Sequence, residues 1–234
     1  MNEDYCGTAM NGESSCFVLA DGLGGHGGGD IASKCAVESV CKLFVESGFS
    51  EHFFSDAFHS AQEAVLEKQE ASQATAQMKT TLVIAVIHEG KTYYSHVGDS
   101  RFYYFKNKRY KFRTLDHSVP QMLVLSKQIK ESEIRNHPDR NRLMRVLGVK
   151  GERPKFEEGQ AVKNSGSQAM LLCTDGFWEL IDEKAMEDTL RQSNSPEMWL
   201  DRMSAIVRDN GKDLEMDNYT AIAVFNKTKG MFGI

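Results

Sequence analysis

The sequence lacks the features that mark several large classes of protein. None of its apolar runs approaches the ~18–20 residues that span a bilayer, and the acidic start at Glu3 and Asp4 lacks the positive charge that opens a signal peptide. An excess of basic residues is also missing, since the net charge is −5, whereas nucleic-acid binding leaves a basic footprint. We therefore expect no membrane partner and no nucleic-acid partner.

A disulfide pattern is absent as well. The five cysteines are odd in number and form no Cys-x-x-Cys pair. Cys35, Cys41 and Cys173 lie inside apolar patterns and are expected to fill the core. This use of cysteine predicts a reducing compartment, the cytoplasm.

Repeats, low-complexity tracts and linker-like segments are missing, so residues 1–234 are expected to form a single, monomeric domain. Strands are predicted at 16–20, 80–87, 92–97, 102–105, 110–115, 169–174 and 219–225, and helices at 31–46, 51–73, 183–191 and 196–208. The strands between 80 and 115 are joined by tight turns, which indicates an antiparallel meander. The pattern predicts an α+β fold of two packed antiparallel sheets with helices outside.

Four aspartates stand where predicted strands end or begin. Asp21, Asp99 and Asp175 follow apolar strands, and Asp217 precedes the last strand. Each one alone is ordinary turn chemistry, because Asp beside Gly or Ser commonly starts a turn. Only the joint pattern indicates a site, in which the four carboxylates converge on one cleft.

Converging carboxylates repel one another unless protons or a cation lie between them. Oxygen ligands without His or Cys suit Mg²⁺ or Mn²⁺ rather than Zn²⁺. Two such ions about 3.5–4 Å apart can activate a water and clamp an in-line displacement. This chemistry suits hydrolysis of a phosphomonoester, which is among the slowest uncatalysed reactions.

The loop after Asp21 is rich in glycine and contains Gly-x-Gly-x-x-Gly from Gly22 to Gly27. A dinucleotide-binding turn is disfavoured, because Asp21 would face the pyrophosphate and the following strands are hairpin-linked. The glycines instead permit close backbone approach, and the Gly22 carbonyl is a candidate metal ligand. His26 is either a general acid or a loop residue bonded to backbone carbonyls, and we favour the second interpretation.

The order and spacing of short motifs resemble one family over nearly the whole chain. The motifs are Asn2-Glu3-Asp4, Asp21-Gly22-Leu23-Gly24-Gly25-His26, Thr80-Thr81-Leu82, Gly98-Asp99-Ser100-Arg101, Asp116-His117-Ser118, His137-Pro138, Asn141, Thr174-Asp175-Gly176-Phe177-Trp178 and Asp217-Asn218. The sequence is identified as a member of the metal-dependent protein serine/threonine phosphatases (the PPM or protein phosphatase 2C-like family), in their compact bacterial form.

The resemblance implies a four-layer α/β/β/α sandwich with the metal site at one end of the two sheets. It also implies a mobile flap, at about 116–148, that influences substrate choice. The implied activity is hydrolysis of phosphoserine and phosphothreonine by a water that two Mn²⁺ or Mg²⁺ ions bind between them. The implied partners are proteins phosphorylated by a serine/threonine kinase.

The resemblance also assigns roles to the acidic residues. The implied metal ligands are Glu3, Asp21, Gly22, Asp99, Asp175 and Asp217. Asp21 would bridge two tightly bound ions, with Glu3 and the Gly22 carbonyl on one and Asp175 and Asp217 on the other. Asp99, helped by Asp175, would hold a weaker third ion. Asp4 would hydrogen-bond a metal-bound water, so Asp21 and Asp4 are the implied catalytic residues.

The sequence departs from the family pattern in three places. The family usually has a strand and an Arg before Asn-Glu-Asp, and both are expected to be missing, since the sequence begins one residue before that motif. We therefore expect weaker phosphate binding, with Glu3 and Asp4 on a frayed terminus. Leu23 stands where some members carry a His. Lys79 stands where a glycine is usual, and the sequence offers no physical account of that change.

Two alternatives remain open. Without the phosphate-binding Arg, the chain could be a catalytically weakened member that binds phosphoproteins as a regulatory module. Retention of all the acidic ligands argues against that interpretation, because a binding module does not need so much clustered charge. The other alternative is a phosphatase that acts on a small metabolite.

Overall fold

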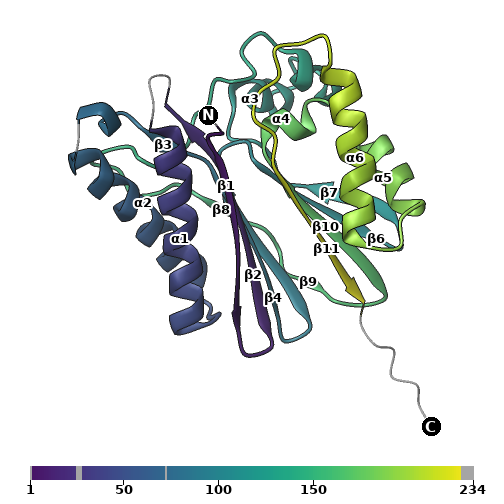
Figure 1. The fold of residues 1–234 in the computed structure, drawn as a ribbon, viewed down its shortest axis with the longest axis horizontal. Coiled ribbons are helices and arrows are strands. Elements are labelled where there is room, and N and C mark those ends of the chain that lie inside the picture. The colour runs from purple at the N-terminus through teal and green to yellow at the C-terminus, as the bar shows by residue number, and fades with distance from the viewer. Residues whose placement is uncertain (1, 25–27, 72, 228–234) are drawn as a thin grey trace.

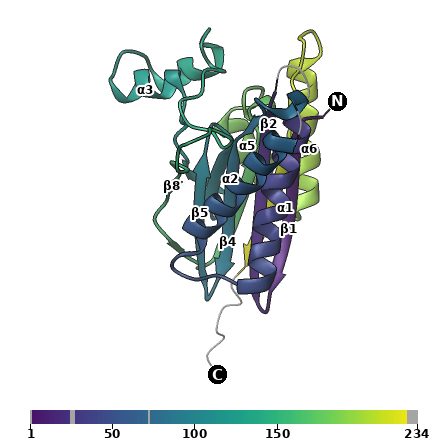
Figure 2. The ribbon, with the colours of Figure 1, turned by 90° about the vertical axis from the view of Figure 1, so that its left-hand side faces the viewer.

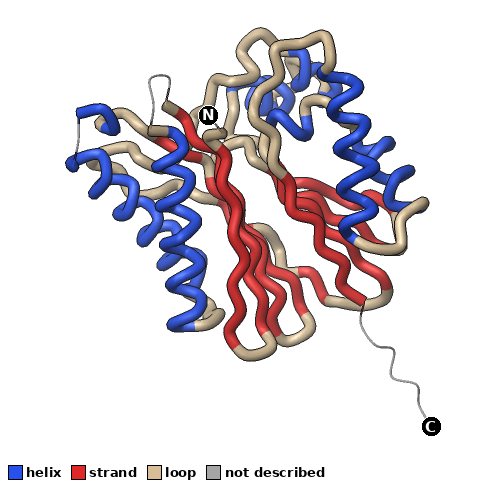
Figure 3. Tube along the Cα trace, in the orientation of Figure 1, coloured by secondary structure: helices blue, strands red, loops and turns tan. Residues whose placement is uncertain are grey.

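The computed structural model describes residues 2–24, 28–71 and 73–227. Two antiparallel β-sheets pack face to face, and helices cover the outer face of each sheet (Figure 1). The layers therefore run helix, sheet, sheet, helix, as the separation of helices and strands in Figure 3 shows. This arrangement confirms the predicted α/β/β/α sandwich.

The first sheet has the strand order β1-β2-β4-β5-β8, with β3 paired to β2 and β9 paired to β5. Its strands are β1 (Asp4–Asn11), β2 (Ser14–Leu23), β3 (Lys79–Thr80), β4 (Leu82–His88), β5 (Lys91–Val97), β8 (Glu157–Glu158) and β9 (Val162–Lys163). Two long helices, α1 (Gly29–Ser47) and α2 (Phe53–Ala71), cover its outer face. Phe44 and Phe58 are fully buried in the core between these helices and the sheet. The short η1 (Gln73–Thr75) follows α2.

The second sheet has the order β11-β10-β6-β7. Its strands are β6 (Arg101–Lys106), β7 (Arg109–Arg113), β10 (Ser167–Cys173) and β11 (Ala221–Lys227), and its helices are α4 (Asp175–Trp178), α5 (Glu183–Arg191) and α6 (Pro196–Gly211). Trp199 of α6 is fully buried and packs edge-on against Phe105 of β6, with ring centroids 5.2 Å apart. Within the described ranges, no helix combines the length and the apolarity needed to cross a membrane.

A third core joins the two sheets. It contains the fully buried Leu19, Phe102 and Leu172, which come from β2, β6 and β10. Alternation along each strand sends these side chains inward, while their neighbours face the helices. The two sheets are thereby fixed relative to each other, so loops at one end of the sandwich are held at constant separation.

The segment between β7 and β8 projects from one end of the sandwich (Figure 2). It contains α3 (Val119–Leu125) and η2 (Glu131–Asn136). Ser118 caps α3, because its Oγ accepts from the Gln121 N–H, and Pro120 lies in the first turn where no N–H is needed. We call residues 116–148 the flap.

Strand β1 corrects one expectation, because Glu3 and Asp4 do not lie on a frayed terminus. Asp4 opens a strand that pairs with β2 along its whole length, starting from Asp4 opposite Asp21. The sequence did not predict β1, because Gly7 occupies a helix-facing position and interrupts the alternation of apolar and polar side chains along the strand. A Cβ on Gly7 would lie 2.8 Å from Val37 Cγ1 of α1, so the close packing of α1 on β1 needs glycine here.

The predicted strand 80–87 is divided. β3 ends at Thr80, β4 begins at Leu82, and Thr81 lies between them. The other predicted strands and helices are present with shifted ends, and α5 covers the predicted 183–191. β2 pairs antiparallel with both β1 and β4, which rules out the parallel βαβ unit of a dinucleotide fold.

Candidate metal centre

Asp21 lies near the end of β2, and the division of the neighbouring strand holds its backbone. The Asp21 N–H donates to Thr81 Oγ1 at 2.9 Å. The Asp21 carbonyl accepts from the Thr81 N–H at 2.9 Å and from Thr80 Oγ1 at 2.7 Å. The two threonines therefore satisfy the backbone of Asp21 and fix the direction of its side chain.

Gly22 brings three segments into close backbone contact. A Cβ on Gly22 would lie 2.0 Å from the Gly29 carbonyl oxygen and 2.7 Å from the Glu3 carbonyl oxygen, so only glycine fits. The Glu3 carbonyl accepts from the Gly22 N–H at 3.1 Å and from Ser33 Oγ at 2.6 Å. The Glu3 carboxyl group lies against Gly29, the first residue of α1, where the helix N-terminus favours negative charge.

Asp175 opens α4 immediately after β10, and its Oδ1 accepts from the Gly176 N–H at 2.6 Å. A Cβ on Gly176 would lie 2.1 Å from the Asn218 carbonyl oxygen, so glycine lets the segment before β11 approach α4. Asn218 Oδ1 accepts from the Glu3 N–H at 2.7 Å. This contact ties the exposed Asp217 and its neighbour to the first sheet.

Asp4 lies at the junction of the two sheets and is only 8% exposed. Its Oδ2 accepts from Thr174 Oγ1 at 2.8 Å, and Thr174 Oγ1 accepts from the Thr220 N–H at 3.0 Å. Burial raises the pKa of Asp4 to about 6, although the Thr220 and Thr174 side chains oppose that shift. Asp4 is thus held by Thr174, which directly follows β10, and by Thr220, which directly precedes β11.

Asp99 follows β5 and is only 4% exposed. Gly98 turns the chain with a φ of 98°, and a Cβ there would lie 2.5 Å from Thr81 Cγ2. The Asp99 carbonyl accepts from Trp178 Nε1 at 3.0 Å. Burial raises the pKa of Asp99 well above its usual range, and the charges of Asp175 and Asp116 raise it further.

One cavity of about 320 Å³ gathers the predicted residues. Its lining consists of Glu3, Asp21, Gly22, Leu23, Gly24, Asp99, Asn141, Leu143, Asp175, Asp217 and Asn218. Every predicted metal ligand is in this set, whereas Asp4 lies beside it. Asn218 was missed as a positioning residue, since its only signal in the sequence is its place next to Asp217. His26 lies outside the described residues.

A second cavity of about 470 Å³ adjoins the first and shares Asn141, Asp175 and Asp217 with it. Arg140 of the flap and Glu179 also line this second cavity and form an ion pair at 2.9 Å. Burial raises the pKa of Glu179 to about 7, and the charge of Asp175 adds to the shift. We call the first cavity, which is lined by the predicted metal ligands, the acidic cavity; the second cavity extends it toward Arg140 of the flap.

The carboxyl groups of the first cavity repel one another. Burial raises the pKa of Asp21 well above its usual range, and Asp175, Asp4 and Asp99 raise it further. Burial and the charge of Asp217 raise the pKa of Asp175. A hydrogen bond between the two carboxyl groups raises the pKa of Asp21 further and opposes the rise in the pKa of Asp175.

Hard divalent cations fit this donor set. The donors are carboxylate and carbonyl oxygens, which suit Mn²⁺ or Mg²⁺, and none of the described lining residues is basic. No three acidic, His or Cys side chains in the described part of the chain are already arranged to hold a metal ion. Burial and mutual repulsion raise the pKa values of Asp21 and Asp175, and a bound divalent cation would favour the ionised forms of both carboxyl groups.

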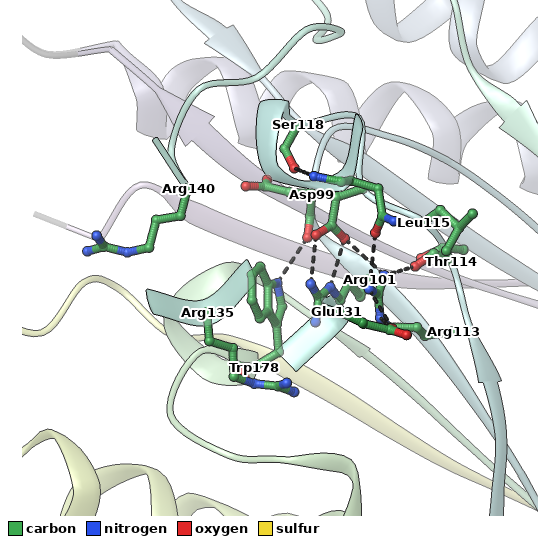
Figure 4. A network of polar contacts seen from close by, with 12 residues as sticks. Asp99, Arg101, Arg113, Thr114, Leu115, Ser118, Glu131, Arg135, Arg140 and Trp178 are labelled. Carbon is green, nitrogen blue, oxygen red and sulfur yellow. Dashed lines mark hydrogen bonds and ion pairs between the residues drawn. The ribbon is translucent and has the colours of Figure 1, made fainter. Parts of the chain in front are cut away.

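A buried ion pair anchors Asp99 and the start of the flap (Figure 4). Arg101 donates to both oxygens of Asp116 at 2.7 Å, and both side chains are about 1% exposed. The Arg101 guanidinium also lies 3.3 Å from the ring centroid of Trp178, whose Nε1 holds the Asp99 carbonyl. Arg101, Asp116 and Trp178 belong to the sequence motifs, but no role was predicted for them. The structure places Arg101 and Trp178 behind the site, as supports.

Comparison with known proteins agrees with this geometry. The sequence matches the family described as "Protein phosphatase 2C" over residues 1–218. It is 32% identical over 202 residues to a serine/threonine phosphatase of Listeria welshimeri, which covers 83% of this chain and 79% of that protein.

Two solved structures share the fold. The S. agalactiae serine/threonine phosphatase has a TM-score of 0.86 and 22% identity, over 97% of this chain and 94% of that one. The catalytic domain of the phosphatase PstP, solved in complex with two manganese ions, has a TM-score of 0.78 and 21% identity, over 96% and 92% of the two chains. The family match, the fold and the acidic cavity lead to one conclusion: the chain belongs to the protein phosphatase 2C family of metal-dependent phosphatases.

Proposed function

We propose that this protein hydrolyses phosphoserine and phosphothreonine in phosphorylated proteins, with the help of bound Mn²⁺ or Mg²⁺. The observation that carries the proposal is the single cavity lined by oxygen donors from separate segments, with no basic residue among them. The Listeria relative is named a serine/threonine phosphatase, which supports the phosphoserine and phosphothreonine substrates. The manganese complex of the PstP catalytic domain supports the choice of metal.

We assign the metal ligands as follows. Asp21 would contact both tightly bound ions, Glu3 and the Gly22 carbonyl would hold one of them, and Asp175 with Asp217 would hold the other. Asp99, with Asp175, would hold a weaker third ion. The support for this assignment is the position of all these groups on one cavity wall, on backbone that threonines and glycines fix.

The bound ions would supply positive charge, which lowers the pKa of an attacking water and neutralises the phosphoryl oxygens. The chain's own residues do the positioning. Thr174 fixes the Asp4 carboxylate beside the cavity, where Asp4 orients a water. The flap residues Asn141 and Leu143 close one wall and limit the entry of other water.

We infer that the substrates are proteins phosphorylated by a serine/threonine kinase, and that the enzyme acts as a monomer in the cytoplasm. The cysteines support a reducing compartment, since all five are free thiols. Analytical ultracentrifugation at micromolar concentration tests whether the protein is a monomer. A molar mass twice that of one chain would contradict the inference.

The proposal is tested with purified protein, an aryl phosphate and a phosphothreonine peptide, in Mn²⁺ and in excess chelator. We expect Mn²⁺-dependent turnover of both substrates, and a loss of at least about 100-fold in Asp21→Asn. Absence of metal-dependent turnover, or equal turnover in Asp21→Asn, would favour the phosphoprotein-binding module instead. Turnover of the aryl phosphate but not of any phosphopeptide, together with cleavage of a phosphorylated metabolite, would indicate a small-molecule phosphatase.

A further inference from the structure

A third cavity lies at the base of the flap, next to α2 and β3. It has a volume of about 270 Å³, and its charged lining comprises Lys79, Arg145, Arg153, Lys155 and Glu152. Four of these five charges are positive. A gathering of cations is unexpected in a chain whose net charge is −5. We call this cavity the basic cavity.

The cations of the basic cavity are mostly unpaired. Lys155 forms an exposed ion pair with Glu152 at 2.9 Å. Arg145 contacts the His117 ring at 3.4 Å, which is no charge partner while the imidazole is neutral. Among the described residues, neither Lys79 nor Arg153 has an acidic partner within ion-pair distance. The cavity therefore holds uncompensated positive charge that a ligand anion could satisfy.

The basic cavity adjoins the acidic cavity. Leu143 lines both of them. Lys79 of β3 is paired with Leu23 of β2, and Leu23 lines the acidic cavity. The next residue, Thr80, holds the Asp21 carbonyl. A chain segment whose phosphorylated residue enters the acidic cavity would therefore pass the mouth of the basic cavity within a few residues, at ~3.3 Å per extended residue.

We propose that the basic cavity binds an anionic residue of the substrate, near the phosphorylated residue in sequence. This inference rests on the proposed phosphatase function and adds a preference to it. The shared chemistry of the ligand is a compact anion, either an Asp or Glu carboxylate or a second phosphate. The proposal also gives a physical account of Lys79, since a glycine at this position would offer no charge to such a residue.

The test uses phosphothreonine peptides that share one sequence except at a single flanking position, which carries Ala, Asp or phosphoserine. Such a set of three peptides is made for each position in turn on both sides of the phosphothreonine. At low salt we expect kcat/KM for the best anionic peptide to exceed that for the Ala peptide about fivefold or more. Lys79→Ala and Arg153→Ala should each remove about two- to fivefold of this preference through KM, with kcat retained. The Asp and phosphoserine arms tell which anion the cavity prefers.

The matched control is Lys111→Ala, which removes an exposed, unpaired lysine of β7 outside the basic cavity. It should leave the peptide preference unchanged, and Lys79→Glu should invert the preference. Equal kcat/KM for anionic and neutral peptides at every position would overturn the proposal, as would an equal loss in Lys111→Ala. Aryl phosphate turnover separates the two claims. If it persists while the preference is absent, only this inference fails; if it is absent in every variant, the proposed function fails.

Discussion

At the scale of single residues, the site keeps carboxyl groups close together at a cost in stability. Asp4, Asp99 and Asp175 are each at most 9% exposed, and burial and mutual repulsion raise their pKa values. A carboxylate in such surroundings stabilises the fold less than a neutral group of the same shape. Buried carboxyl groups with raised pKa values, which lower the stability of the fold, are expected at functional sites.

Asp175→Asn tests this reasoning directly. We expect Mn²⁺-dependent turnover to fall at least about 100-fold, because a metal ligand is lost. The melting temperature of the metal-free protein should stay equal or rise by a few degrees, since clustered charge is removed. Asp201→Asn, on the exposed side of α6, is the control and should change neither quantity. Loss of activity that occurs only together with unfolding would contradict the ligand assignment.

His117 gives the protein a defined response to acid. Its ring is 8% exposed, stacks on His96 at 4.6 Å, and faces Arg145 at 3.4 Å and Glu157 at 3.5 Å. Burial, with help from His96 and Arg145 and against Asp116, lowers the pKa of His117 to about 3. The unfolded chain binds this proton near pH 6.5, so stability falls as the pH drops below that value.

The measurement is the free energy of unfolding of the metal-free parent and of His117→Gln, from pH 7.5 to pH 5. The parent should lose about 2 kcal/mol more than the variant by pH 5, since the His117 pKa is lowered across that whole window. Parallel curves for the two proteins would show that folded and unfolded His117 bind the proton over the same pH range, so that the His117 pKa is not lowered by folding. The difference between the curves removes the opposite trend of the carboxyl groups, which are common to both.

At the scale of elements, the flap is attached to the second sheet through η2. Arg135 donates to the Trp178 carbonyl at 3.0 Å and to the Ile181 carbonyl at 3.3 Å, and it pairs with Glu183 at 2.9 Å. Figure 4 shows Arg135 and Trp178 at the end of the buried ion-pair network of Arg101. The flap is thus bonded to backbone that also supports Asp99.

Arg135→Ala should lower the free energy of unfolding by about 2–3 kcal/mol, because three acceptors lose a charged donor. Amide hydrogen exchange should accelerate in residues 131–136, and the aryl phosphate kcat should change little. The control is Arg142→Ala, whose guanidinium pairs only with the half-exposed Asp139 in the same segment, and its effect should stay below about 0.5 kcal/mol. Equal effects of the two substitutions would show that η2 is not an anchor.

At the scale of the whole molecule, the metal site joins the two sheets. Asp21 comes from the first sheet, Asp175 follows the second, and Asn218 of the second half bonds to Glu3 of the first. We propose that both sheets fold as one domain around the core of Leu19 and Phe102. Ions that bind between the halves would therefore stabilise the complete fold.

Mn²⁺ should raise the melting temperature of the parent. At a concentration about 100 times Kd, binding contributes about 2.7 kcal/mol, or about 5–10 °C for a protein of this size. Asp21→Asn should show little of this shift, and NaCl of matched ionic strength should not produce it in either protein. Differential scanning calorimetry with and without chelator provides the measurement, and an equal shift in Asp21→Asn would contradict the placement of the ions.

Much of the fold could be predicted from local pattern. The helices and most strands follow from apolar periodicity, and α5 lies where the sequence placed it. β1 and the break at Thr81 could not be predicted, because both depend on distant partners. Gly7 is explained by the approach of α1, and Thr81 leaves the strand ladder to bond with Asp21.

The sequence by itself determined the chemistry of this protein, because oxygen-donor residues beside glycines at several strand ends carry their meaning in residue type and spacing. Only the tertiary structure decided which groups act together. It tied Glu3 to Asn218 at 2.7 Å across the two sheets, placed Arg101 and Trp178 behind Asp99, and set Lys79 beside Arg153 in a basic cavity. The physical reason is that charge repulsion, burial and backbone approach depend on distances between segments far apart in the chain, which no local pattern records.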